Sequence, residues 1–180
     1  MSDLTMTHAG ISTTKNSGAE VLTAEKKLTQ MNMTVHDVSP TVTTNACSDG
    51  EIIFNATKIE NMVSTKGGSC IIQSVELIDD DDNGATIDLV FFNALLTLGT
   101  AGGPIDAADG AVPDNILGVV KVTNYFDGIN WQIGHKNNIG LVIKAADTVR
   151  DVYVAAINRH GGAKTWTAAG IKLKIGVIQD

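Results

Sequence analysis

The residues best suited to chemistry are the successive aspartates at positions 79–82, which are followed by Asn83 and Gly84. Their spacing matches the opening half of an EF-hand calcium loop, in which oxygen ligands recur at alternate positions. The closing glutamate of such a loop would fall at position 90, which is Val90. Because valine supplies no oxygen ligand, we interpret the acidic run as a solvated hairpin turn and expect no bound cofactor. A weak calcium site at a subunit boundary is the alternative.

The other reactive side chains are scattered along the chain. The histidines share no strand or helix spacing; they are His8, His36, His135 and His160. Cys47 and Cys70 do not form a C-x-x-C pair, and we expect both to be small buried hydrophobic residues. Nucleophilic catalysis needs an activated serine or cysteine, but the sequence contains no G-x-S-x-G elbow and no glycine-rich phosphate loop. We therefore expect a protein that is not an enzyme.

Four aromatic residues could form a sugar-stacking platform like that of β-sandwich lectins; they are Tyr125, Trp131, Tyr153 and Trp166. With an aromatic content of 4%, the chain has little material for such a platform. Tyr153 falls in a predicted strand and is expected to be a core residue. Trp131 and Trp166 flank predicted loops, where they could equally anchor a protein interface.

Composition and charge exclude several classes of partner. The chain of 180 residues is 43% hydrophobic and carries a net charge of −7, with Arg150 and Arg159 as its arginines. Nucleic-acid binding needs a basic patch, so direct contact with nucleic acid is not expected. The first residues lack the basic and apolar regions of a signal peptide, and no apolar run approaches the length that spans a bilayer. We expect no contact with a membrane.

The elements that must position these residues are short strands. Residues 170–178 alternate between apolar and polar, with Ile171, Leu173 and Ile175 opposite Lys172 and Lys174. Further strands are predicted at 40–44, 51–56, 70–78, 86–92, 117–123, 130–135, 139–143 and 149–157. Turn residues separate them, including those at 66–68, 82–84, 127–128, 136–138 and 160–162. This spacing predicts an all-β fold, an antiparallel β-sandwich or jelly roll, at residues 39–180.

Residues 1–38 form a predicted N-terminal arm, in which only positions 19–28 have helix-forming composition. Isolated apolar residues along the arm are expected to act as anchors on a partner; they are Leu4, Met6, Ile11, Val21, Leu22, Leu28, Met31 and Met33. The long connection at 99–115 is a second contact candidate, because such loops are usually functional. The contact residues predicted in the β domain are Pro104, Ile105, Val112, Trp131 and Trp166.

Several motifs resemble, in collinear order, a group of tailed-bacteriophage proteins. The run at 71–75 (IIQSV), the acidic turn and the run at 85–93 (ATIDLVFFN) are similar to the family pattern GG-x-IQSV, a turn and a-IDLVLF. The similarity continues through 104–109 (PIDAAD), 117–120 (LGVV), 138–141 (NIGL) and 176–180 (GVIQD). It spans residues 39–180. The chain differs from the pattern in its long arm and in extra glycine and proline residues at 99–115.

The family that these motifs resemble is that of jelly-roll capsid cement, or decoration, proteins. The resemblance implies a virion structural protein that is made in the cytoplasm of a host bacterium and binds the outer surface of the phage head. It would stabilise the shell by bridging major capsid protein subunits, as a homo-oligomer that is either a trimer or a dimer. Two alternatives stay open: a carbohydrate-binding β-sandwich on a virion, and a head-completion or tail structural protein.

Overall fold

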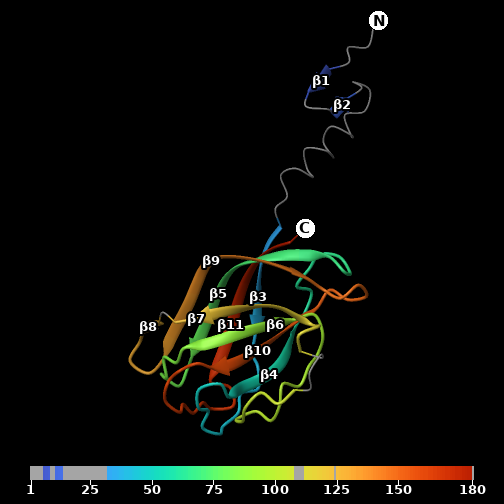
Figure 1. Ribbon diagram of the computed structural model, residues 1–180. Helices are drawn as coiled ribbons and strands as arrows, with labels where there is room; N and C mark the ends of the chain where they lie inside the picture. The colour runs from blue at the N-terminus through green and yellow to red at the C-terminus, as the bar shows by residue number, and fades with distance from the viewer. Residues whose placement is uncertain (1–5, 9–10, 14–31, 108–111, 124, 180) are drawn as a thin grey trace, which may run out of the picture. The chain divides into compact units, whose positions relative to one another are not determined.

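A computed structural model describes residues 6–8, 11–13, 32–107, 112–123 and 125–179 (Figure 1). The chain divides into two compact units, Met1–Asn32 and Met33–Asp180. In the first, strand β1 (Met6–His8) pairs antiparallel with β2 (Ile11–Thr13), so that a short hairpin lies in the region expected to be an arm. The helix-forming residues 19–28 lie outside the described residues.

The larger unit is built from strands, and the described residues contain no helix that could span a membrane. Its strands are β3 (Asn32–Val38), β4 (Ile52–Ile59), β5 (Ser69–Asp79), β6 (Ile87–Phe92), β7 (Ile116–Val122), β8 (Tyr125–Asp127), β9 (Gln132–Lys144), β10 (Val152–Asn158) and β11 (Ile171–Gln179). They form a four-stranded sheet of order β4-β10-β6-β7 and a five-stranded sheet of order β3-β11-β5-β9-β8. The predicted all-β sandwich is confirmed.

The strand order is that of a jelly roll. The first long strand pairs with the last, β3 with β11, in one sheet, and the next pair, β4 with β10, lies in the other. The pairs β5 with β9 and β6 with β7 continue this alternation. Such an order arises when one long antiparallel ribbon is wrapped around a barrel-like core.

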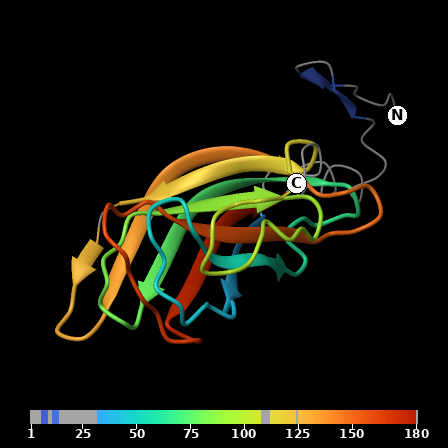
Figure 2. The ribbon, with the colours of Figure 1, turned by 60° about the horizontal axis from the view of Figure 1, so that its bottom comes forward.

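The core lies between the two sheets, and β11 shows why the sequence places it there. Its residues alternate between buried and exposed from Ile171 onward, as the period of two predicts. Lys172 and Lys174 face solvent, and Leu173 is buried in the core. The sheets approach each other along one side, where β7 lies beside β9 (Figure 2). The Cys47 and Cys70 side chains are buried, as expected.

Three sequence predictions about element boundaries differ from the structure. Residues 136–138 do not form a turn but lie within β9, where the register against β5 shifts between Ile72 and Ser74. Asn138 takes a φ of 56° there, since asparagine tolerates this conformation at a bulge as well as at a turn. Residues 40–44 form no strand, because their backbone bonds to two different segments: Val42 N donates to Ala168 O, and Thr43 N to Ile53 O.

Strand β3 is the third difference. It occupies residues 32–38, which the sequence analysis placed in the arm, and it forms one edge of the five-stranded sheet. The Lys174 ammonium lies 3.3 Å from the Asp37 carboxylate, which ties this edge strand to its neighbour β11. The sheet therefore begins near residue 32.

Candidate interaction surface

The acidic turn is a folded structural element rather than a solvated loop. Asp79 ends β5 and is fully buried, and its carboxylate accepts hydrogen bonds from the backbone N–H groups of Asp81, Asn83 and Gly84 at 2.9–3.2 Å. Asp80 forms an ion pair with Lys172 at 2.6 Å. The acids are therefore used to hold the turn together, which corrects the expectation that their charges would all be exposed.

Burial raises the pKa of the Asp79 carboxyl, although the backbone donors act in the opposite direction. Burial also raises the pKa of the nearby Tyr125 phenol far above its usual range, and the Asp79 charge adds to that increase. The Tyr125 hydroxyl donates to the Ala85 carbonyl just after the turn. Among the described residues, no group of three or more histidine, cysteine or acidic side chains is placed to hold a metal ion.

The four aromatic residues do not gather on one face. Trp166 is only 1% exposed and belongs to the main core, which corrects its prediction as a surface contact. Tyr125 packs against the same core, and Tyr153 packs against a second cluster on the other side of the four-stranded sheet. Trp131 is partly exposed at the β8–β9 turn. This arrangement does not form a sugar-stacking platform.

The second cluster builds a groove on the outer face of the four-stranded sheet. Every residue of β6 is buried. Val90 and Phe92 point away from the main core and are buried in this second cluster instead. The described parts of the segment between β6 and β7, residues 93–107 and 112–115, lie over the same face. This covering segment is held to β4 by Asn55, whose amide donates to Gly99 O at 3.0 Å and accepts from Leu98 N at 2.8 Å. The segment covers the face only in part, and a groove of about 200 Å³ stays open.

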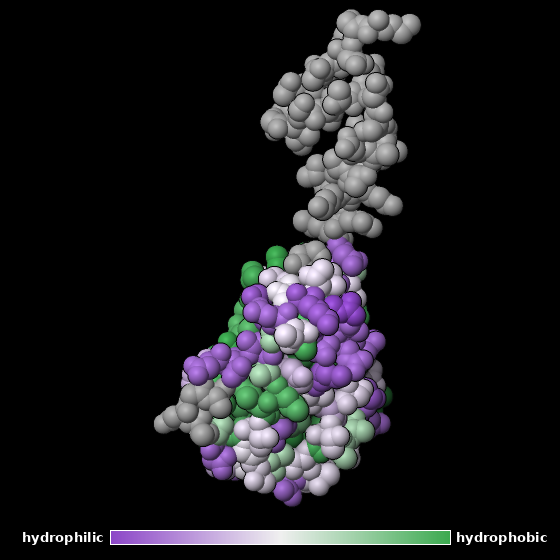
Figure 3. All heavy atoms as spheres, turned by 90° about the vertical axis from the view of Figure 1, so that its right-hand side faces the viewer, coloured by the Kyte–Doolittle hydropathy of each residue, from purple (hydrophilic) through white to green (hydrophobic). Residues whose placement is uncertain are grey.

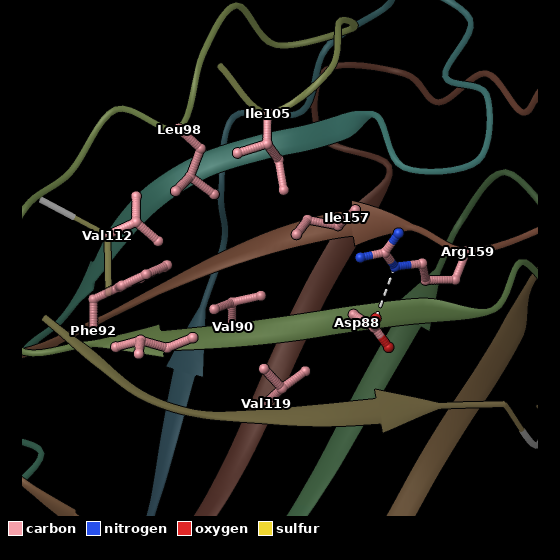
Figure 4. Close-up of a pocket in the computed structure, with 10 residues that line it drawn as sticks. Asp88, Val90, Phe92, Leu98, Ile105, Val112, Val119, Ile157 and Arg159 are labelled. Atoms are coloured by element: carbon pink, nitrogen blue, oxygen red, sulfur yellow. Dashed lines mark hydrogen bonds and ion pairs between the residues drawn. The ribbon is translucent and has the colours of Figure 1, made fainter. Parts of the chain in front are cut away.

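Apolar side chains form most of the groove walls (Figure 4). Leu98, Ile105 and Val112 come from the covering segment, while the sheet contributes Val90, Phe92, Ile116, Val119 and Ile157. Ile105, Ile116 and Val119 are also among the exposed large hydrophobic residues, so the groove continues into an apolar surface. Figure 3 shows one side of the molecule on which hydrophobic residues gather into a patch bordered by polar ones.

One end of the groove is charged. Arg159 Nε donates to Asp88 Oδ2 at 2.8 Å, and this pair lines the groove (Figure 4). The Lys121 ammonium lies 3.9 Å from Asp88 Oδ1, which is too far for a hydrogen bond, and this buried oxygen has no hydrogen-bond donor. Because one carboxylate faces two cations, this end of the groove carries an excess of positive charge.

The hairpin tip, defined by Phe126, Ile129 and Trp131, is a second exposed apolar feature. Ile129 at its apex is 90% exposed and Phe126 is 63% exposed. The Phe126 and Trp131 ring centroids are 5.9 Å apart, and Gly128 N donates to Trp131 O at 2.8 Å. A Cβ at Gly128 would lie 2.6 Å from the Trp131 ring, so glycine lets the indole fold beneath the turn. The tip is thus preorganised by its own contacts.

A third feature, the outer row, crosses the five-stranded sheet. Ile178 of β11 lies opposite Ile71 of β5, and Ile71 lies opposite Val142 of β9. Their neighbours along each strand are buried, except Leu141, which is partly buried and packs against the main core, so these side chains point away from the core. Val142 is 65% exposed. The row is an apolar stripe on the sheet face opposite to the main core.

The structure places the predicted contact residues in different settings. Leu4, Val21, Leu22, Leu28 and Met31 lie outside the described residues, and Met6 and Ile11 belong to the β1–β2 hairpin. Met33 is exposed on β3, Pro104 is exposed and bridges to Glu51, and Ile105 and Val112 line the groove. Ile116, Val119, Ile129 and Val142 were not predicted, although an apolar residue at a turn apex, as in the D-G-I-N-W run, could have indicated Ile129.

No model of a known protein family matches the sequence, and a search of curated proteins finds no significant match.

Proposed function

We propose that this chain is a non-catalytic structural protein of a phage virion. It binds the outer surface of the head and stabilises the shell by bridging major capsid protein subunits. The jelly-roll order of the strands is compatible with the family that its motifs resemble. The observation that carries the proposal is the exposure of large apolar side chains in separate places: the groove, the hairpin tip and the outer row.

Exposed apolar patches on a soluble domain usually mark sites of contact with other proteins. Patches in several places suit a protein that touches several neighbours at once, as a component of a shell does. Each contact can then be weak, because contacts made together add through effective concentration. The net charge of −7 favours the outside of a head over its DNA-lined interior.

We assign the capsid contact to the outer row together with the arm. The outer row is an apolar stripe on the face of the sheet opposite to the core, which suits a broad protein surface. The isolated apolar residues of the arm suit a strap laid across a neighbouring subunit, because an extended segment covers much area at modest affinity per contact.

The test is co-sedimentation with phage heads that lack this protein. The full chain should bind saturably and raise the temperature at which the heads break open. Val142→Glu places a charge in the outer row and should weaken binding by about tenfold or more. Glu76→Gln is the matched control, because it changes an exposed side chain of β5 on the same sheet and leaves the outer row intact.

Deletion of residues 1–31 tests the strap, and it stops before residue 32 because β3 begins there. The shortened chain should keep its melting temperature and lose most of its head binding. If the folded full chain does not bind heads, the proposed function is wrong. If the full chain binds heads and the shortened chain binds them equally well, the arm has no part in attachment.

A further inference from the structure

The hairpin tip and the groove have matching chemistry. The tip presents Ile129 and Phe126 with the Asp127 carboxylate between them in sequence. The groove has apolar walls, and Arg159 and Asp88 line one end of it. The exposed Lys121 ammonium lies beside that end, 3.9 Å from Asp88, so two cations face one carboxylate there. An apolar side chain accompanied by an acid is the ligand that such a groove fits best.

The two features also match in size and rigidity. A volume of about 200 Å³ accepts one large aliphatic side chain with part of its neighbour, but not a folded element. The tip offers such a side chain on a turn already fixed by the Gly128–Trp131 hydrogen bond and by the Gln132 amide, which donates to Asp127 Oδ1 at 3.3 Å. Because the turn is ordered before binding, little conformational entropy is lost when it docks.

The tip cannot reach the groove of its own chain. Strand β8 is held against β9 by the pairs Tyr125 with Gly134 and Asp127 with Gln132. A Cβ at Gly134 would come within 2.7 Å of the Tyr125 ring, so the strand is packed closely in place. In both ribbon views β8 lies at one end of the sandwich, away from the segment that covers the groove (Figures 1 and 2).

We propose that the hairpin tip of one copy of this chain docks into the groove of a second copy. Ile129 enters the apolar part of the groove, and the Asp127 carboxylate faces Arg159 and Lys121. The contact joins two different surfaces of the chain. One such contact per pair is heterologous and generates either a closed ring or an open row of copies, whereas two reciprocal contacts within a pair close a two-fold dimer. Its area is smaller than that of a stable dimer interface, so single contacts are weak and gain strength when copies are arrayed together.

This contact is separate from the proposed attachment to heads, and sedimentation equilibrium of the free full chain tests it. Self-association should appear by about 1 mM, the level of a weak single contact. Ile129→Ser removes the apolar apex, and Val119→Glu places an acid at the groove, where it repels Asp127. Each variant alone should associate about tenfold or more weakly than the natural chain. Val142→Glu, which alters the outer row, should associate normally.

Mixing the two variants gives the decisive result. Ile129→Ser keeps an intact groove and Val119→Glu keeps an intact tip, so the mixture should form one-to-one complexes that grow no further. A contact of tip with tip, or of groove with groove, does not produce this pattern.

A second measurement, chemical crosslinking, detects association that is too weak to be seen by sedimentation equilibrium. Ile129→Cys in one chain and Val119→Cys in another should be joined by a short bismaleimide, whereas Val142→Cys should not be. The proposal is overturned if the natural chain stays monomeric and the Ile129→Cys and Val119→Cys chains also fail to crosslink. It is likewise overturned if Ile129→Ser and Val119→Glu both associate as the natural chain does. Either result leaves head binding by the outer row and arm untouched, so the two proposals fail separately.

Discussion

Asn55→Ala should release the segment that forms one wall of the groove. The substitution removes the acceptor of Leu98 N–H and the donor to the Gly99 carbonyl. Each backbone group that stays buried without a partner costs about 1–3 kcal/mol. Asn55 lies at a partly buried site, where water can reach some of these groups, so we take the lower half of the range. Two groups at about 1–2 kcal/mol each give an expected loss of about 2–4 kcal/mol in the free energy of unfolding.

This loss of free energy cannot exceed the cost of detaching the segment, because the segment can leave the sheet instead of staying in place with unpaired backbone groups. Detachment exposes Leu98, whose burial contributes about 1.5–3 kcal/mol, and breaks the backbone bonds between Ile52 and the segment at Gly102 and Gly103. If Asn55→Ala detaches the segment, a second change within it should add little. Leu98→Ala alone should cost about 2–5 kcal/mol, and the double variant should fall short of the sum by about 1 kcal/mol or more.

Urea unfolding of the single and double variants gives these free energies, and amide hydrogen exchange shows where the change occurs. In Asn55→Ala, the Leu98, Gly102 and Asp106 amides should exchange much faster, because they bond within this segment or to β4. The Leu173 amide in β11 should exchange at a rate set by global unfolding. Fully additive free energies, or unchanged exchange in the segment, would refute the assignment of Asn55 as the residue that pins it.

Two further predictions concern the sandwich itself. Leu173→Ala should destabilise the protein by about 2–5 kcal/mol because the side chain is buried. Lys172→Ala should cost less than about 1 kcal/mol because its ion pair with Asp80 is exposed. Urea unfolding that reversed this order would mean that β11 faces the other way. For Asp79, a pKa raised in the folded chain means that the folded state holds this proton more tightly than the unfolded state. Its contribution to stability is therefore present below the ordinary pKa and is lost as pH rises through the folded value. Unfolding of the natural chain and of Asp79→Asn at pH values from about 7 to 4 should show the natural chain gaining relative to the variant as pH falls; an opposite trend would mean that the backbone donors outweigh burial.

The sequence predicts the strands well where one face of the strand is exposed to solvent and the other is buried. In β11 the lysines mark the solvent side, so the alternation identifies both the strand and its orientation. In β6 the same method gives the strand but not its surroundings. The alternation at 86–92 places Asp88 on the same face as Val90 and Phe92. Both apolar residues are buried, because residues of the connection after β6, such as Leu98, fold back over them. Burial of this kind depends on a tertiary contact, which no local pattern contains.

Turn chemistry shows a second limit. Asn138 takes a positive φ angle, in keeping with the turn residues recognised at 136–138, whereas the positive φ of Gly140 falls in a predicted strand. The sequence does not show whether the chain reverses at Asn138 or continues, and β9 in fact continues through a bulge. The acidic run has a related ambiguity. Aspartate favours turns because its carboxylate bonds to nearby backbone N–H groups, and Asp79 does so from a buried position rather than in water.

The groove itself follows from the composition of the covering segment. Gly102 takes a φ of 86° and its Cα lies close to Asn45, so that an added Cβ would come within 2.8 Å of the Asn45 side chain. Glycines and alanines at 99–103 let the backbone lie directly on β4, with Gly102 N bonded to Ile52 O at 2.8 Å. The segment has large apolar residues only at intervals, so it closes over the β4 side of the sheet and leaves β6 and β7 partly uncovered. A run of small residues that resembles a simple linker thus determines which part of the sheet is available to a partner.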